Sequence, residues 1–269
     1  MGRQYDTVSF LSDYGLSDEF VGVVKSVIRT LAPATAVIDL THEIPPHDVR
    51  AGSLALVRAV QYLAPGIVLA VVDPGVGTDR RAVAVEVADG AAVFVGPDNG
   101  LMASAVAMAG GAGACVELTN EEYQLPAPGP TFAGRDVFAP AAAHLCNGVD
   151  LRELGPEIDP VTLRPGILPL PREEAGRLLC EVLWVDRFGN LQLNISEDEI
   201  ARFGDHVTLR FGEQIRTARR RRTYGDIKAG EVGLVVDSYG LLSLAFDRVS
   251  AAGELGLRPG DGVSLAEPE

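Results

Sequence analysis

The sequence places an aspartate and an arginine pair around a turn that could bring them together. Asp73 ends the apolar segment Val68–Val72, and a Pro-Gly-Val-Gly turn precedes Arg80 and Arg81. A carboxylate at the carboxyl end of a buried strand, with a guanidinium folded back beside it, is typical of a polar ligand site at the rim of a parallel sheet. The alternative is a turn with an incidental surface ion pair, because such pairs are common and weak.

Two further segments carry residues suited to ligand binding. Residues 130–136 read PTFAGRD, where Gly134 lets a ligand approach the backbone closely and the adjacent arginine and aspartate could anchor the loop by pairing. Residues 185–190 read VDRFGN and offer a carboxylate, an aromatic face and an amide. Those groups would suit an ammonium group, a purine ring and an exocyclic amine. For Phe188 alone, packing in the core is the alternative interpretation.

These segments lie in a chain whose first part alternates strand-like and helix-like patterns. Up to about residue 165, the alternation predicts a mostly parallel sheet with helices on its faces. The expected strands cover residues 7–11, 36–40, 67–72, 82–87, 92–95 and 114–117, and the expected helices cover 18–31, 49–62 and 101–109. Polar residues follow four of these strands, at 12–13, 41–43, 73 and 98–99. Because ligands of open α/β sheets bind outside the carboxyl ends of the strands, we expect a ligand site there.

A composition shift predicts a boundary between two domains. Residues 159–171 contain four prolines and a glycine, and such a segment favours neither helix nor central strand. We therefore expect an α/β domain over residues 1–165 and a smaller domain over residues 172–269. In the second domain, short strands separated by turns predict an antiparallel barrel or sandwich, with strands at 178–185, 191–195, 206–211, 233–237, 241–245 and 262–265.

The composition is that of an acidic globular protein. The chain has 269 residues, 47% of them hydrophobic, and a net charge of −14. This charge argues against a nucleic-acid partner, because binding to phosphates needs a concentrated basic surface. The one basic run, Arg219–Arg222, is interpreted as a solvated strand or hairpin face. Cys115, Cys146 and Cys180 in apolar context, and no apolar segment long enough for a signal peptide or membrane span, favour a cytoplasmic protein.

Six motifs along the chain together resemble one family. They are SDYG at residues 12–15, VVDPGVGTDRR at 71–81, GPDNGL at 96–101, TFAGRD at 131–136, VDRFGN at 185–190 and DSYGLLSLA at 237–245. In this order, over nearly the whole chain, they closely resemble the S-adenosylmethionine hydroxide adenosyltransferases, whose superfamily includes fluorinases and chlorinases. The resemblance implies an N-terminal Rossmann-like α/β domain, a C-terminal β-barrel, and a homotrimer with active sites between subunits.

The resemblance also implies a reaction and the residues that perform it. In the family, a water-derived hydroxide attacks C5′ of S-adenosylmethionine (SAM) and gives adenosine and methionine, so we expect no cofactor and no metal. By resemblance, Asp73 and Arg80 orient and activate the water. The resemblance assigns Asp13 to the ribose hydroxyls, Phe188 and Asn190 to adenine, Asp186 to the methionine ammonium, Ser238 to the methionine carboxylate, and Thr131 and Phe132, beside Gly134, to the region near C5′. His47 falls where superfamily members cover the adenine plane, although an ordinary surface histidine is the alternative.

One position departs from the family pattern. Where the hydroxide transferases carry histidine in a TFHGRD stretch, this chain has Ala133, and the halogenases generally have tyrosine. A methyl group can neither accept a proton nor hold a water by hydrogen bonding, and losing a general base typically costs about 10²- to 10⁴-fold in rate. We therefore expect intact ligand binding with slow catalysis.

Other functions are compatible with parts of this pattern. A SAM- or adenosine-binding protein without turnover would keep the binding residues and tolerate Ala133. A halogenase would use halide in place of water, but halogenases carry tyrosine at the position of Asp73, and a carboxylate there repels a halide. A methyltransferase is disfavoured, because only Gly15 stands where a glycine-rich first turn is expected.

Overall fold

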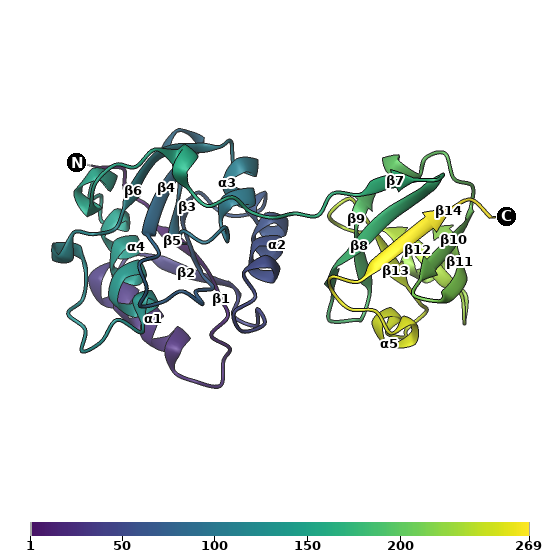
Figure 1. Ribbon diagram of the computed structural model, residues 1–269. Helices are drawn as coiled ribbons and strands as arrows, with labels where there is room; N and C mark the ends of the chain where they lie inside the picture. Colours follow the sequence, from purple (N-terminus) through teal and green to yellow (C-terminus); the bar gives the residue numbers. More distant parts are fainter. Residues whose placement is uncertain (1, 269) are drawn as a thin grey trace. The chain divides into compact units, whose positions relative to one another are not determined.

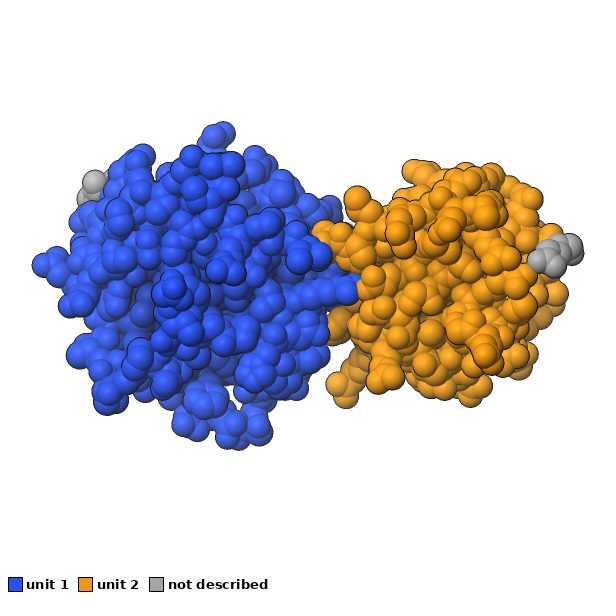
Figure 2. Space-filling view, viewed as in Figure 1, with its two compact units in different colours: residues 1–167 blue, residues 168–269 orange. Residues whose placement is uncertain are grey.

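The chain folds into two compact units. A computed structural model describes residues 2–268, and the units comprise residues 1–167 and 168–269 (Figure 2). The division falls within the proline-rich segment 159–171, of which Pro160–Thr162 forms a short 3-10 helix. Each unit has its own cluster of buried apolar side chains.

The first unit contains a six-stranded sheet in the order β2-β1-β3-β5-β4-β6 (Figure 1). Its strands are β1 (Thr7–Ser12), β2 (Ala36–Thr41), β3 (Gly66–Val71), β4 (Ala82–Val87), β5 (Ala92–Pro97) and β6 (Ala112–Glu117). The pairings β1–β2, β1–β3 and β3–β5 are parallel, whereas β4 runs antiparallel to both β5 and β6. The predicted, mostly parallel sheet is confirmed.

Helices cover both faces of this sheet. They are α1 (Phe20–Leu31), α2 (Val49–Val60), α3 (Ala103–Met108) and α4 (Ala139–Cys146). α1 packs against α4 on one face, and α2 lies beside α3 on the other (Figure 1). α1 buries Val21, Val24 and Ile28, whose spacing of three and four residues is the amphipathic pattern that predicts a surface helix.

The parallel strands bring the polar segments of the sequence analysis to one edge of the sheet. Asp13 follows β1, His42 follows β2, Asp73 closely follows β3, and Asp98 follows β5. Parallel strands share the edge at which their carboxyl ends lie, so these segments are neighbours. A π-helical turn at Gly134–Phe138 leads into α4, and such turns are frequent at functional sites.

The second unit is a closed β-barrel. Its strands are β7 (Arg172–Glu174), β8 (Arg177–Val185), β9 (Leu191–Ser196), β10 (His206–Phe211), β11 (Gln214–Arg221), β12 (Val232–Val236), β13 (Leu241–Ala245) and β14 (Gly262–Ala266), and α5 (Ala251–Leu255) follows β13. Because β14 pairs with both β10 and β8, seven strands form a ring, and β7 adds to β8 outside it. The predicted barrel is confirmed with one correction, since β11 and β12 pair in parallel.

The first half of β11 could not be predicted from the sequence. Residues 214–217 are all exposed, so the strand shows no alternation of apolar and polar residues there. The basic run lies at the end of this strand, where Arg220 pairs with Glu197 and Arg221 with Glu231. Its interpretation as a strand face is therefore confirmed.

The cysteines are buried, as their apolar context predicts. Burial raises the pKa of the Cys115 and Cys146 thiols to about 11 and that of Cys180 to about 12. These thiols are accordingly protonated and unreactive at neutral pH. Over residues 2–268, no helix is both long enough and apolar enough to cross a bilayer.

Candidate active site

Asp73 and Arg80 form a buried ion pair at the carboxyl edge of the sheet. Arg80 Nε donates to both carboxylate oxygens of Asp73, at 2.9 and 3.0 Å, and Nη2 also donates to Oδ2. Only 7% of the Asp73 side chain and 13% of the Arg80 side chain are exposed. The guanidinium carbon also lies 5.2 Å from the centroid of the Phe138 ring. These contacts fix both charged groups in one orientation.

The turn between the two residues depends on glycine. The Thr78 hydroxyl donates to the Gly75 carbonyl at 2.6 Å, which closes the turn. Gly77 has a φ of +78°, and a Cβ there would lie 3.0 Å from the carbonyl oxygen of Pro130. A side chain at this position would therefore meet both an unfavourable backbone angle and the neighbouring proline-rich loop.

Arg81, the neighbouring arginine, has a different partner. Its Nε and Nη2 donate to Asp98 Oδ2 at 2.9 and 2.6 Å, and its Nη1 donates to Thr162 Oγ1 at 2.9 Å. Asp98 Oδ1 accepts from the backbone N–H of Arg164 at 2.8 Å. Arg81 and Asp98 thus fasten the segment that leaves the first unit. The pairing of Asp73 with Arg80, which the spacing predicts, is confirmed.

A cavity of about 250 Å³ opens beside the Asp73–Arg80 pair. It is lined by the predicted residues Asp13, Asp73, Thr131, Phe132, Ala133 and Gly134, by His47, and by Tyr14. The structure therefore brings together all the site residues predicted in the first unit except Arg80, which pairs with Asp73 at the wall. Segments that lie more than a hundred residues apart in the sequence share this cavity.

Asp13 is held by the backbone of the turn that follows β2. The His47 N–H donates to Asp13 Oδ2 at 2.8 Å. His47 has a φ of +69°, and the Asp48 N–H donates to the Pro45 carbonyl at 3.0 Å, so His47 occupies the third position of a tight turn that favours glycine. Strain of this kind in a non-glycine residue is common at ligand sites.

A buried histidine supports the segment that carries Asp13. His42 Nδ1 lies 2.8 Å from Ser12 Oγ, and His42 Nε2 lies 3.2 Å from Asp39 Oδ1. The His42 carbonyl also accepts from the N–H of Gly15 at 2.7 Å. These bonds hold residues 12–15 against β2, so this polar strand end serves the site by positioning it.

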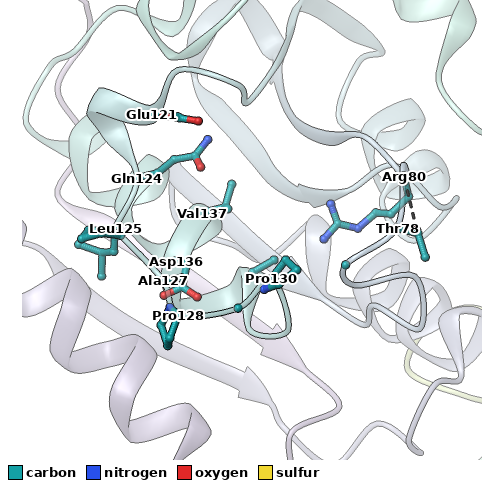
Figure 3. A pocket seen from close by; sticks show the side chains of 14 residues that line it. Thr78, Arg80, Glu121, Gln124, Leu125, Ala127, Pro128, Pro130, Asp136 and Val137 are labelled. Carbon is teal, nitrogen blue, oxygen red and sulfur yellow. Dashed lines mark hydrogen bonds between the residues drawn. The ribbon is translucent and has the colours of Figure 1, made fainter.

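A larger cavity of about 800 Å³ shares Ala133 with the first. Figure 3 shows Arg80 on one side of this larger cavity and Pro128 and Asp136 on the other. Asp73 lines the small cavity, while its partner Arg80 lines the large one. Ala133 therefore lines both spaces, so a change of side chain at position 133 would affect them both.

The segment after Ala133 is anchored by an ion pair of adjacent residues. Arg135 Nε and Nη2 donate to the two carboxylate oxygens of Asp136 at 2.6 and 2.9 Å. The Arg135 guanidinium carbon lies 5.1 Å from the centroid of the Phe132 ring. The pairing predicted for this loop is confirmed, and it holds one wall of the small cavity.

Tyr14 is a site residue to which the sequence analysis gave no role. A Cβ on Gly134 would lie 2.1 Å from the Tyr14 hydroxyl oxygen, so the absence of a side chain at 134 admits this tyrosine. Burial, followed by the charges of Asp13 and Asp73, raises the pKa of Tyr14. Its position directly after Asp13 in the SDYG motif was the available signal.

In the second unit, Asp186 and Asn190 are joined across the turn from β8 to β9. Asp186 Oδ1 accepts from the N–H groups of Phe188 and Asn190 at 2.9 and 2.8 Å, and Oδ2 accepts from the Asn190 amide at 2.8 Å. The turn leaves Phe188 80% exposed, so its interpretation as a core residue is wrong. An exposed ring on an ordered turn offers a face to a planar ligand.

Ser238 lies in a second turn, between β12 and β13, that Asp237 organises. Asp237 Oδ1 accepts from two backbone N–H groups of the turn, and Oδ2 accepts from the Gln192 amide at 2.6 Å. Burial, followed by the charges of Asp237 and Asp186, raises the pKa of Tyr224. The Asp237–Gln192 bond therefore ties this turn to β9, the strand that follows the turn carrying Asp186 and Asn190.

The charges around the small cavity do not cancel. Asp13 and Asp73 contribute two carboxylates, and the guanidinium of Arg80 neutralises one of them. The remaining negative charge suits a cationic ligand, and free carboxylate lone pairs suit hydroxyl donors. Residues 2–268 contain no group of three or more histidine, cysteine, aspartate or glutamate side chains arranged to hold a metal ion.

The protein belongs to the class that joins an α/β domain to a β-barrel domain, with an Asp–Arg pair at the carboxyl edge of the sheet. Comparison with known families makes the class specific. Residues 8–155 match the model of the SAM hydroxide adenosyltransferase N-terminal domain, and residues 180–264 match that of the C-terminal domain. The chain belongs to the SAM hydroxide adenosyltransferase family, as the motifs predicted.

Individual relatives agree with this assignment. The chain is 46% identical over 254 residues to a protein of Salinispora tropica named (R)-S-adenosyl-L-methionine hydrolase, covering 94% of this chain and 95% of that protein. A fluorinase of an Actinoplanes species is more distant, at 27% identity over 292 residues and 97% of each chain. The crystal structure of an uncharacterized conserved protein from Thermotoga maritima is similar with a TM-score of 0.88 and 35% identity, covering 97% of this chain and 100% of that one.

Proposed function

We propose that this protein hydrolyses SAM to adenosine and L-methionine. The observation that carries the proposal is the buried Asp73–Arg80 pair at the wall of a cavity that also holds Asp13 and Thr131. Family membership and the name of the Salinispora tropica relative support the substrate. That name also specifies the (R) epimer, so we propose (R)-SAM, with its inverted sulfonium, as the preferred substrate.

The cavity suits a displacement at C5′. Water attacks C5′ in line with the C5′–S bond, the bonding pair passes to sulfur, and the cationic sulfonium becomes the neutral thioether of methionine. The leaving group therefore needs no proton, and the barrier lies in fixing and deprotonating the water. We propose that Asp73 receives the proton and that Arg80 fixes Asp73. The net negative charge of the cavity favours the cationic substrate over the neutral products.

The remaining predicted residues are proposed to bind the rest of the substrate. Asp13, with one oxygen already fixed by the His47 N–H, accepts hydrogen bonds from the ribose hydroxyls. Asp186, Phe188, Asn190 and Ser238 bind the methionine and adenine ends. Since each unit carries only part of this set, we propose a homotrimer in which the second unit of a neighbouring chain completes each site. The exposure of Phe188 supports this arrangement. The buried cysteines support a cytoplasmic location.

The departure at Ala133 sets the expected rate. Without a histidine at this position, the site lacks one group able to accept a proton, so we propose a slow hydrolase. A binding protein without turnover would have the same residues and differ only in product release. Halide transfer is disfavoured, because the Asp73 carboxylate would stand beside the incoming halide.

Incubation with (R)-SAM and (S)-SAM in oxygen-18-labelled water tests the proposal. We expect adenosine and methionine in equal amounts, faster from the (R) epimer, with the label on the adenosine 5′-oxygen. Label in homoserine, or release of methylthioadenosine, would place the attack on the methionine side of sulfur and contradict the proposal. Binding of SAM without product over many hours would identify a binding protein, and halogenated adenosine at high chloride would identify a halogenase.

A further inference from the structure

We infer that the Tyr14 hydroxyl is the third polar group of the water site, beside Asp73 and Arg80, on the side where this chain has Ala133. The inference deepens the proposed hydrolysis and rests on it. Tyr14, which lies two residues after β1, would hold the attacking water, which an alanine at position 133 cannot do.

The approach of Tyr14 to the site is fixed by backbone geometry. A Cβ on Gly134 would lie 2.1 Å from the Tyr14 hydroxyl oxygen and 3.1 Å from the carbon that bears it. Only a residue without a side chain admits the hydroxyl there. Because Gly134 directly follows Ala133, the hydroxyl lies against the backbone next to position 133, where the family pattern has histidine. Tyr14, Asp73 and Ala133 all line the small cavity.

The ring that carries this hydroxyl is held by other aromatic rings. The Tyr14 centroid lies 5.7 Å from that of Phe132, 5.8 Å from that of Phe20 and 6.4 Å from that of Phe10. The contacts with Phe132 and Phe10 are edge-to-face, a favourable arrangement for aromatic pairs. The packing therefore positions the ring, and within residues 2–268 the hydroxyl makes no hydrogen bond to the protein, so it can serve a ligand.

The electrostatic surroundings keep the hydroxyl neutral. Burial and the carboxylates of Asp13 and Asp73 raise the pKa of Tyr14, and Arg80 opposes them only in part. Tyr14 lines the same cavity as Asp73, whose carboxylate is paired with Arg80. A neutral phenol can accept one hydrogen of a water and can also donate, but it cannot take up the proton.

The reaction balances with Tyr14 unchanged. One hydrogen of the water bonds to the Tyr14 oxygen, and the other points to Asp73. As the C5′–O bond forms and the C5′–S bond breaks, the electron pair of the breaking bond goes to sulfur. The proton leaves the oxygen for the Asp73 carboxylate and then passes to solvent. Tyr14 orients the water and keeps its own proton, so it contributes positioning only.

The variant Tyr14→Phe removes this hydroxyl and retains the ring. We expect kcat for SAM hydrolysis to fall about 10- to 100-fold, because the attacking water loses its fixed position, with KM for SAM nearly unchanged. Tyr5→Phe is the matched control. The Tyr5 hydroxyl donates to the Gly90 carbonyl at 3.0 Å, and Tyr5 precedes β1 at the opposite end of the strand from Tyr14. This control should keep the wild-type kcat and KM.

A second background separates positioning from folding. In Ala133→His protein, the histidine can hold the water, so adding Tyr14→Phe should lower kcat by less than it does in the wild type. Equal losses in both backgrounds, or a parallel rise in KM, would assign Tyr14 a structural role and overturn the inference. An unchanged kcat in Tyr14→Phe would overturn it directly while leaving the proposed hydrolysis intact. Wild-type protein that releases no adenosine would overturn the proposed function and this inference together.

Discussion

Asp73 and Asp98 follow neighbouring parallel strands, β3 and β5, and pair with consecutive arginines, Arg80 and Arg81. Both carboxylates are largely buried, with 7% and 5% of their side chains exposed. Their surroundings differ. Asp73 lines the small cavity, whereas Asp98 binds the backbone of the segment that leaves the first unit. Of the two consecutive arginines, Arg80 therefore belongs to the candidate reaction centre, and Arg81 holds the segment that leaves the first unit.

The first prediction uses these two aspartates as a matched pair. Asp73→Asn should lower kcat for SAM hydrolysis by about 10²-fold or more, because an amide cannot receive the proton of the attacking water. Asp98→Asn should leave kcat near the wild-type value. Each variant leaves a partly buried arginine without its charged partner, so each should lower the free energy of unfolding by up to about 3 kcal/mol.

Steady-state kinetics and calorimetry on the two variants check this prediction. Comparable losses of kcat in both proteins would mean that the effect of Asp73 is transmitted through folding. A normal kcat in Asp73→Asn would remove Asp73 from the reaction.

The two aspartates also show which features of the site the sequence could predict and which it could not. The end of a strand and a turn of seven residues are local features. Periodicity and turn residues therefore predicted both the position of Asp73 at the end of the strand and its ion pair with Arg80. The same local pattern surrounds Asp98. Its structural role depends on Thr162 and Arg164, more than sixty residues away, and no local signal distinguishes it from a ligand-binding residue.

Other features depended on tertiary contacts in the same way. Tyr14 is placed by the packing of Gly134 against it, a contact between segments 120 residues apart that no periodicity encodes. The parallel pairing of β11 with β12 follows from closure of the barrel, and the exposed residues of β11 carry no alternation that would reveal it. The buried strands, in contrast, were predictable because burial on both faces leaves continuous apolar runs.

The second prediction concerns Ala133. Ala133→His should raise kcat by about 10²-fold, because a ring at this position, which lines the cavity that Asp73 also lines, would supply a proton acceptor for the water. KM should change little. The rate of adenosine release from saturating SAM measures the effect. An unchanged rate would show that no general base is missing at this position.

The third prediction concerns Phe188, whose side chain is 80% exposed in the second unit. Phe188→Ala should raise KM for SAM about 10-fold, through loss of stacking on adenine, while the melting temperature stays the same. Ile215→Ala removes another exposed apolar side chain of the same barrel and should change neither quantity. A fall in the melting temperature of Phe188→Ala would indicate a packing role in the assembled protein instead.

The fourth prediction concerns the stability of the barrel and its dependence on pH. Glu231 accepts from Arg221 Nε and Nη2 at 2.6 and 2.7 Å, and this contact, against the opposing effect of burial, lowers the pKa of Glu231 below its ordinary value of 4.5. A carboxylate whose pKa is lower in the folded state stabilises that state above its unfolded pKa, and the contribution is lost as pH falls through the folded value. Glu231→Gln should therefore melt at a lower temperature than the wild type at pH 7. The difference in melting temperature between the two proteins should stay constant down to about pH 5 and narrow below pH 4.5.

The single tryptophan, Trp184, lies in β8, so its fluorescence follows unfolding of this unit. Glu213→Gln, at an exposed position in the turn between β10 and β11, is the control and should match the wild type at pH 7. A melting difference that persists unchanged at pH 3 would mean that Glu231 acts through packing and not through its charge.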